Sequence, residues 1–281
     1  MSGAFADALA RYREEGYAVV RGMFSRDEVA AIAHSFDRHW RTGMAHRASW
    51  RHGNLFYRQG KDPALGKILR LVQWPSYVDP VLESIRRDPR WRDLLEPLVG
   101  RDVKQIINQL HWKPPGATAA DFAFHQDVRF RRPRSAYRNL VDAYVQTGIA
   151  VDLHSAASGA MRILPGSHRL GEIEIAGQGA VLDQKMADER LARCGLDPSR
   201  LVDLALEPGD VALWNLYTIH GSGPNRTSSD RRFYLNGYVR ASDCDRGEWA
   251  FRDGAPVPLG DPVLVHYDDL FARPEPHFVE T

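Results

Sequence analysis

The sequence predicts an α+β protein with a mainly β core, a β-sandwich or barrel flanked by N-terminal helices. Two observations support this fold class. Helical patterns with capping residues dominate up to residue 100, whereas the chain beyond it consists of short apolar runs separated by Pro and Gly. The chain has 281 residues without an internal repeat or a low-complexity linker, so we expect a single domain over 1–281.

The first elements alternate between helix and strand. A short helix, a strand and a longer helix are predicted in turn, at residues 5–15, 17–24 and 25–40. Ser25 and Glu28 fit a capping box at the start of the longer helix. A further helix is expected at 88–100, because Pro89 suits the first helical position and Gly100 ends the run.

The β core is expected in the rest of the chain. Turn signals separate the predicted strands, which lie at residues 103–116, 122–130, 143–153, 159–168, 202–215 and 231–240. Residues 170–200 interrupt this series, and within them 182–195 is typical of a helix that ends near Gly195. We expect 170–200 to form a lid or insertion at a pocket mouth, and the aromatic segment 50–60 to form a second lid.

The composition is that of an ordinary soluble globular protein, with 43% hydrophobic and 26% charged residues. The formal net charge is +1, so no global field attracts the protein to nucleic acid or to an anionic membrane. No segment has the roughly 18 apolar residues of a membrane span, and we expect a cytoplasmic protein. Cys194 and Cys244 lack a CxxC spacing, so a metal site would use His and carboxylates.

A histidine and an aspartate stand two positions apart in the apolar run FHQDVRF, residues 124–130. Side chains alternate along a strand, so His125 and Asp127 are expected to point to one face. An imidazole and a carboxylate on one face can share a metal ion. The spacing also fits a hydrogen-bonded pair in a partly buried strand, and only a third ligand from elsewhere in the chain would favour the metal.

His220 is the candidate third ligand, because it ends an apolar run and precedes a loop rich in Gly, Ser, Pro and Asn. A strand-end histidine bonded to the backbone is the alternative. In the next strand, period two places Arg231 on the face of the apolar Phe233 and Leu235. A guanidinium in a core is costly unless it meets an anion, so a buried anion is expected there. Two histidines and one carboxylate with open positions form the ligand set of non-haem Fe(II) oxygenases.

These residues resemble the phytanoyl-CoA dioxygenase family of Fe(II)/2-oxoglutarate-dependent oxygenases. The motifs that carry the resemblance are HQD at 125–127, MRILPGSH at 161–168, PGDVALWN at 208–215 and HGSGPNR at 220–226, followed by Arg231. The similarity covers the chain from about residue 10 to residue 240, and the combination is specific although each motif alone is not. It implies a double-stranded β-helix core, also called a jelly-roll or cupin-like core.

The resemblance also implies roles for individual residues. His125, Asp127 and His220 would hold Fe(II), while Arg231 and Ser222 would bind the far carboxylate of 2-oxoglutarate, which is a co-substrate together with O2. The implied activity is hydroxylation of an unactivated C–H bond of a small metabolite or natural-product intermediate, with release of succinate and CO2. Asp127 is intact, whereas related halogenases have a small residue at that place, so hydroxylation is the better hypothesis.

Two further positions bear on the co-substrate. Gln109 falls where the family often has a co-substrate contact, and period two turns it to the same side of its strand as Gln105, His111 and Lys113. Gly148 departs from the pattern, because some members have a bulky aromatic residue there that flanks the co-substrate. We therefore expect a pocket of altered shape beside Gly148.

Two alternative functions fit parts of the pattern. A cupin-like metal-binding protein of another chemistry, such as an isomerase or hydrolase, would explain the metal ligands but not Arg231. A non-catalytic ligand-binding relative would be expected to have lost a metal ligand, and none is lost in this sequence. The residues favour the oxygenase.

The substrate is expected to be a small molecule, and a basic cluster is compatible with an anionic one. Five arginines lie within residues 129–138, directly after the metal pair. Arg129 continues the parity of His125 and Asp127 along the predicted strand, so it is the candidate substrate-binding residue. The alternative is a solvated loop, the usual state of a run of like charges.

Overall fold

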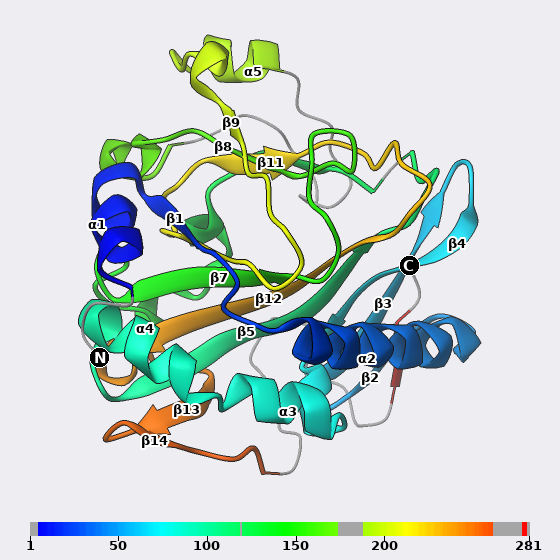
Figure 1. Ribbon diagram of the computed structural model, residues 1–281, viewed down its shortest axis with the longest axis horizontal. Coiled ribbons are helices and arrows are strands. Elements are labelled where there is room, and N and C mark those ends of the chain that lie inside the picture. Colours follow the sequence, from blue (N-terminus) through cyan, green and yellow to red (C-terminus); the bar gives the residue numbers. More distant parts are fainter. Residues whose placement is uncertain (1–4, 119, 174–187, 261–276, 280–281) are drawn as a thin grey trace.

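The computed structural model describes residues 5–118, 120–173, 188–260 and 277–279. Its strands form a large sheet and a smaller, four-stranded sheet, which lie over each other (Figure 1). Neighbouring strands in both sheets run antiparallel. The predicted α+β class with a double-stranded β-helix core is confirmed by this arrangement.

The large sheet has the order β1-β10-β7-β12-β5-β4-β3-β2-β15, with β13 paired to β5 and β14 to β13. Its strands are β1 Tyr17–Val20, β2 Ser49–His52, β3 Leu55–Asp62, β4 Gly66–Gln73, β5 Val103–Lys113, β7 Tyr144–Ala150, β10 Val211–Trp214, β12 Arg231–Arg240, β13 Glu248–Arg252, β14 Ala255–Pro256 and β15 His277–Val279. The central strand β7 is buried at every position, because other elements cover both of its faces. The segment 50–60, expected as a lid, instead supplies β2 and most of β3.

The small sheet has the order β6-β11-β8-β9. Its strands are short, and they are β6 Phe122–His125, β8 Met161–Ile163, β9 Val202–Asp203 and β11 His220–Ser222. The predicted strand over 122–130 is therefore wrong beyond His125, because Asp127–Phe130 form a 3-10 turn. Tertiary hydrogen bonds impose that turn: the side chain of Gln126 donates to the carbonyls of Gly171 and Tyr217.

Helices α2, α3 and α4 cover the outer face of the large sheet (Figure 1). The described helices are α1 Ala6–Glu15, α2 Arg26–Ala45, α3 Pro80–Arg86, α4 Pro89–Val99 and α5 Asp188–Arg193. Phe36 packs on Trp112 with ring centroids 4.9 Å apart, and Trp91 packs on Tyr238 at 5.6 Å. Because this apolar layer covers one face of β5 and β12, the opposite face of these strands points toward the small sheet.

The predicted helix starts agree with the observed caps. Ser25 and Glu28 form both hydrogen bonds of a capping box ahead of α2, and Gly100 caps the end of α4 with a left-handed φ of 84°. Of the predicted helix 182–195, the described part contains α5, and 182–187 lie outside the described residues. The role of 170–200 as a lid stays a prediction. Among the described helices, none combines the length and the apolar character that a membrane crossing requires.

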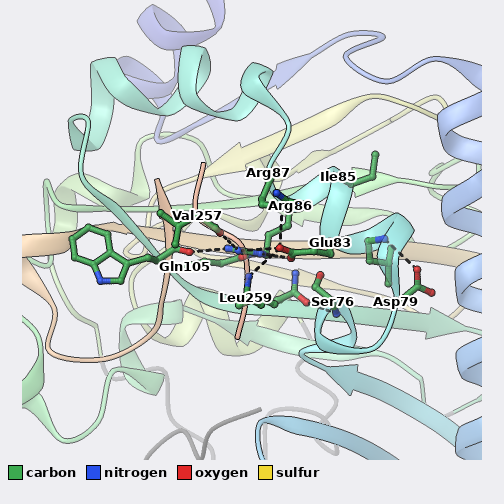
Figure 2. A network of polar contacts seen from close by, with 12 residues as sticks. Ser76, Asp79, Glu83, Ile85, Arg86, Arg87, Gln105, Val257 and Leu259 are labelled. Carbon is green, nitrogen blue, oxygen red and sulfur yellow. Dashed lines mark hydrogen bonds and ion pairs between the residues drawn. The ribbon is translucent and has the colours of Figure 1, made fainter. Parts of the chain in front are cut away.

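A buried arginine joins helix α3 to the C-terminal part of the large sheet. Arg86 has no exposed surface, and its guanidinium donates to the Glu83 carboxylate and to the carbonyls of Trp249 and Val257 (Figure 2). Every nitrogen of this guanidinium therefore has an acceptor, as a structural buried charge requires. The network lies on the helix side of the sheet and fixes β13 against α3.

A β-bulge interrupts the pairing of β5 with β12. Gly237 pairs with Ile107 and Tyr238 pairs with Gln105, so Ile106 is the extra residue. The bulge reverses the alternation, and the side chain of Gln105 donates to Asn236 on the helix side of the sheet. The prediction that Gln105 shares the face of Gln109 is therefore wrong.

Candidate functional site

A cavity of about 310 Å³ lies between the two sheets. Its lining residues come from β3, β4, β5, β7, β10 and β12 of the large sheet, from β6, β8 and β11 of the small sheet, and from the segment that follows β6. His125, Asp127 and His220 line it, and one potential ligand atom from each lies within 4.8 Å of the other two. All three side chains are buried. The structure therefore brings the three predicted metal ligands together.

Strand pairing aligns the two histidines. His125 of β6 pairs with His220 of β11, and their ring centroids are 4.3 Å apart. Each Nδ1 is hydrogen-bonded to a backbone carbonyl of its own strand region, Ala123 O at 2.7 Å and Thr218 O at 2.9 Å. The Nε2 atoms face Asp127, at 3.4 and 3.8 Å from its carboxylate oxygens. Bonding at Nδ1 fixes the tautomer that leaves Nε2 available as a ligand.

The electrostatics of the three residues suit a divalent cation. Burial, assisted by the neighbouring His125, lowers the pKa of His220 to about 4, so its imidazole is neutral at physiological pH. Burial alone would raise the pKa of Asp127, but His220 and His125 together lower it well below its ordinary value. An ionised carboxylate beside a neutral imidazole is the protonation state that metal binding requires.

Two donors from the large sheet orient the Asp127 carboxylate. Its Oδ2 accepts hydrogen bonds from Trp214 Nε1 at 2.8 Å and from Gln146 Nε2 at 3.2 Å. Such bonds hold a ligand carboxylate in one orientation and direct its other oxygen to the metal. The sequence interpretation missed both donors. The available signal for such a donor was Gln146, an amide side chain within the mainly apolar strand β7.

A cluster of two cations lies at the Arg231 end of the cavity. Arg231 is 4% exposed, and its Nη2 donates to Gly159 O at 3.1 Å, while its Nε has no partner among the described residues. Lys113 lies opposite Arg231 in the strand register and donates to Ser222 Oγ at 2.6 Å. Burial lowers the pKa of Arg231 to about 10, so it stays charged at neutral pH. Lys113 was expected on this face but was not recognised as a site residue.

The predicted face of β12 is confirmed. Arg231, Phe233 and Leu235 line the cavity, whereas Arg232 lies on the opposite face and pairs with Asp152 at 2.8 Å. Because Arg232 has its own carboxylate and Arg231 does not, the two adjacent arginines serve different purposes. Of these two, Arg231 is the one that can meet an anion that enters the cavity.

An aromatic ring fills the space beside Gly148, where the sequence left the shape of the pocket open. A Cβ atom at Gly148 would lie 2.1 Å from Cζ of Phe233, so the Phe233 ring occupies the space above this glycine. The aromatic ring beside this position therefore comes from the neighbouring strand β12. Gln109 also lines the cavity, and its Oε1 is 2.9 Å from Nε2 of His111.

Arg129 lies differently from the prediction. Because β6 ends at His125, Arg129 belongs to the 3-10 turn and no longer shares the parity of the metal ligands. It is half-buried, its guanidinium lies 5.6 Å from the Phe130 ring centroid, and it is not among the residues that line the cavity. The arginine of this cluster that lines the cavity is Arg131, which the sequence interpretation did not single out.

A sequence model of the phytanoyl-CoA dioxygenase (PhyH) family matches residues 12–233. The protein belongs to the phytanoyl-CoA dioxygenase family. A relative from Stutzerimonas stutzeri, named a probable alpha-ketoglutarate-dependent hypophosphite dioxygenase, is 30% identical over 246 residues, which are 84% of this chain and 79% of the relative. A methylphosphonate hydroxylase of Gimesia maris is 25% identical over 161 residues, 57% of this chain and 55% of that protein.

The solved structures agree with the phytanoyl-CoA dioxygenase fold. The crystal structure of EctD from S. alaskensis with 2-oxoglutarate and 5-hydroxyectoine superposes with a TM-score of 0.64 at 20% identity, covering 92% of this chain and 88% of that one. As a member of this family the protein is a 2-oxoglutarate-dependent non-haem iron oxygenase. The buried residues fit both groups: three ligand atoms converge for Fe(II), and Arg231 presents an unpaired Nε to a carboxylate.

Proposed function

We propose that this protein hydroxylates a C–H bond of a small molecule, with 2-oxoglutarate and O2 as co-substrates. The observation that carries the proposal is the order of groups along one cavity, in which the His125, Asp127 and His220 cluster and the buried Arg231 share the same walls. This order supports the oxygenase over a cupin-like protein of another chemistry, because the latter has no need of Arg231. All three metal ligands are present, which speaks against a non-catalytic relative.

The chain's own residues would bind and orient the reactants. His125, Asp127 and His220 would hold Fe(II), which together with bound 2-oxoglutarate and O2 supplies the oxidising power. Arg231 and Ser222 would bind the distal carboxylate of 2-oxoglutarate. Arg231 has the geometry for this, because its fork can pair with two carboxylate oxygens while Gly159 O keeps its Nη2 in place.

The cavity walls would hold the co-substrate and exclude water from the reaction. Gln109 lies on the wall next to His111 and is proposed as a further co-substrate contact. The apolar side chains of Met161, Phe233 and Leu235 line the same space. They would keep bulk water from the metal and leave the substrate C–H as the nearest oxidisable bond.

The size of the cavity supports a small substrate. Ligand pockets range from roughly 300 to 1,000 Å³, and this one of about 310 Å³ has to hold 2-oxoglutarate as well. The names of two relatives, a hypophosphite dioxygenase and a methylphosphonate hydroxylase, also refer to small compounds. In the proposed reaction R–H, 2-oxoglutarate and O2 give R–OH, succinate and CO2, so one atom of O2 enters R–OH and the other enters succinate.

The test is succinate release from 2-oxoglutarate by the purified protein. Slow release without added substrate is expected with Fe(II), and none is expected without iron or in Asp127→Ala. Small metabolites that accelerate release are then incubated under ¹⁸O₂. Label in a new hydroxyl group of the product and in succinate supports hydroxylation. A desaturated product without label, or no iron-dependent succinate at all, would show that the proposal is wrong.

A further inference from the structure

Arg131 is a buried arginine in the wall of the cavity, and part of its guanidinium has no hydrogen-bond partner among the described residues. It is 1% exposed, and neither its Nε nor its Nη2 has a hydrogen-bond partner among the described residues. These two nitrogens form one edge of the guanidinium, the edge that can bind two oxygens of one anion side by side. Arg131 lines the same cavity as the metal ligands, so such an anion would be a ligand of the cavity.

A comparison within the molecule shows that Arg131 is not an ordinary structural arginine. Arg86 is equally buried, but each of its nitrogens donates to the Glu83 carboxylate or to a backbone carbonyl. A structural buried charge is satisfied in this way, because an unpaired one is destabilising. Arg131 lacks such acceptors for Nε and Nη2, which is the state expected of a ligand-binding residue.

The position of Arg131 separates it from the proposed co-substrate site. Arg231 lies at the first residue of β12, opposite Lys113 at the last residue of β5. Arg131 acts electrostatically on Tyr144, which pairs with Val239 near the other end of β12, and on the metal ligand Asp127. The neighbours of Arg131 therefore differ from those of Arg231, and Arg131 is not part of the Arg231–Lys113 cluster.

The rest of the arginine cluster is accounted for by other contacts. Arg132 and Arg134 both pair with Glu172, Arg138 pairs with Asp245 at 2.8 Å, and Arg129 lies over the ring of Phe130. The cluster is thus mainly a solvated surface, as runs of like charges usually are. Arg131 is the exception, because it is buried and is one of the residues that line the cavity.

We propose that Arg131 binds an oxyanion of the substrate, a carboxylate or a phosphonate, through its Nε and Nη2 edge. The substrate is then a small anion, and its reacting carbon is held toward His125, Asp127 and His220 by this anchor. The inference rests on the proposed function and adds the substrate class and the residue that selects it. Because a neutral analogue of the same shape would leave the buried guanidinium charge unpaired, it should bind poorly.

The test measures binding by isothermal titration calorimetry, so that it does not depend on turnover. Methylphosphonate and propionate are titrated anaerobically into the Fe(II)-loaded protein, with and without 2-oxoglutarate, against the neutral dimethyl methylphosphonate and propionamide. At least one anion should bind the wild type, and Arg131→Gln should bind it about 30-fold more weakly or worse. Arg129→Gln, the matched control, should bind it as the wild type does. The preferred anion distinguishes a phosphonate from a carboxylate substrate.

Two further measurements separate this role from a structural one. The thermal midpoint of Fe(II)-loaded Arg131→Gln should not fall below that of the wild type, and Arg131→Lys should recover part of the anion affinity. The proposal is overturned if neither anion binds the wild type, if Arg131→Gln binds as tightly, or if that variant melts well below the wild type. Iron-dependent succinate release by the wild type, measured separately, reports on the proposed function alone.

Discussion

Lys113 and Arg231 face each other across the β5–β12 pairing, and both donate to the carbonyl of Gly159, at 3.2 and 3.1 Å. Burial and the neighbouring Arg231 lower the pKa of Lys113 well below its ordinary value. Two buried cations that share one neutral acceptor disfavour each other's charge. A carboxylate beside them would relieve this repulsion. The end of the cavity at Lys113 and Arg231 therefore favours anions on electrostatic grounds alone.

The geometry of Arg231 should matter more than its charge. Arg231→Lys keeps the charge but loses the two-pronged edge, so the KM for 2-oxoglutarate should rise by about tenfold or more while the affinity for Fe(II) changes little. Steady-state succinate release and metal titration measure the two quantities. Arg232→Lys, on the opposite face and paired with Asp152, is the matched control. An equal effect of both variants would contradict the assignment.

The affinity for iron should depend on Gln146, although it does not touch the metal. Gln146→Met keeps the size of the side chain and removes one of the two donors to Asp127 Oδ2. We expect the affinity for Fe(II) to fall about 10-fold or more, measured by anaerobic titration. Gln105→Met is the control, because Gln105 is also buried but donates to Ile107 O and Asn236 Oδ1 and not to Asp127. Unchanged affinity in Gln146→Met would exclude the orienting role.

The stability of the metal-free protein should fall between pH 6.5 and pH 3, in part because of His111. Burial, followed by the charge of Arg231, lowers the pKa of His111 from 6.5 to about 3. The unfolded chain then binds a proton that the folded chain does not, so the free energy of unfolding decreases as the pH falls through this window. Between pH 7 and pH 4 the free energy of unfolding should therefore fall by up to about 3 kcal/mol more in the wild type than in His111→Gln. Denaturant unfolding at both pH values measures the difference, and parallel losses in both proteins would refute it.

The contact of Gly148 with Phe233 should appear as a coupled pair. Gly148→Ala places a methyl group where the Phe233 ring lies and should lower the free energy of unfolding by about 1–3 kcal/mol. Phe233→Leu in the same chain shortens the side chain and should recover part of that loss. A double-mutant cycle from denaturant unfolding quantifies the coupling. Strict additivity of the two changes would mean that the ring moves aside without strain.

Local patterns predicted the features that depend on local geometry. The face of Arg231 follows from alternation along one strand, and the start of α2 follows from Ser25 and Glu28 three residues apart. The metal ligands were found from their residue types and from the motifs around them. In each of these cases the relevant contacts lie within one element or its immediate neighbours.

Features that depend on contacts between distant segments could not be predicted in this way. The chain turns after His125 because Gln126 and Val128 bond to the segment before β11, and this turn moves Arg129 away from the cavity and Arg131 into it. The bulge at Ile106 has a similar effect on Gln105, because it arises from the pairing with β12 and leaves no local signal.

The metal ligands also connect the two sheets mechanically. His125 and His220 belong to the small sheet, while Asp127 is held by Trp214 and Gln146 of the large sheet. Strands of two to four residues give the small sheet few backbone hydrogen bonds of its own. A bound ion would therefore link the two sheets and reduce local opening of the small sheet. Amide hydrogen exchange in β6 and β11 would then slow more on metal loading than exchange in β5 and β12.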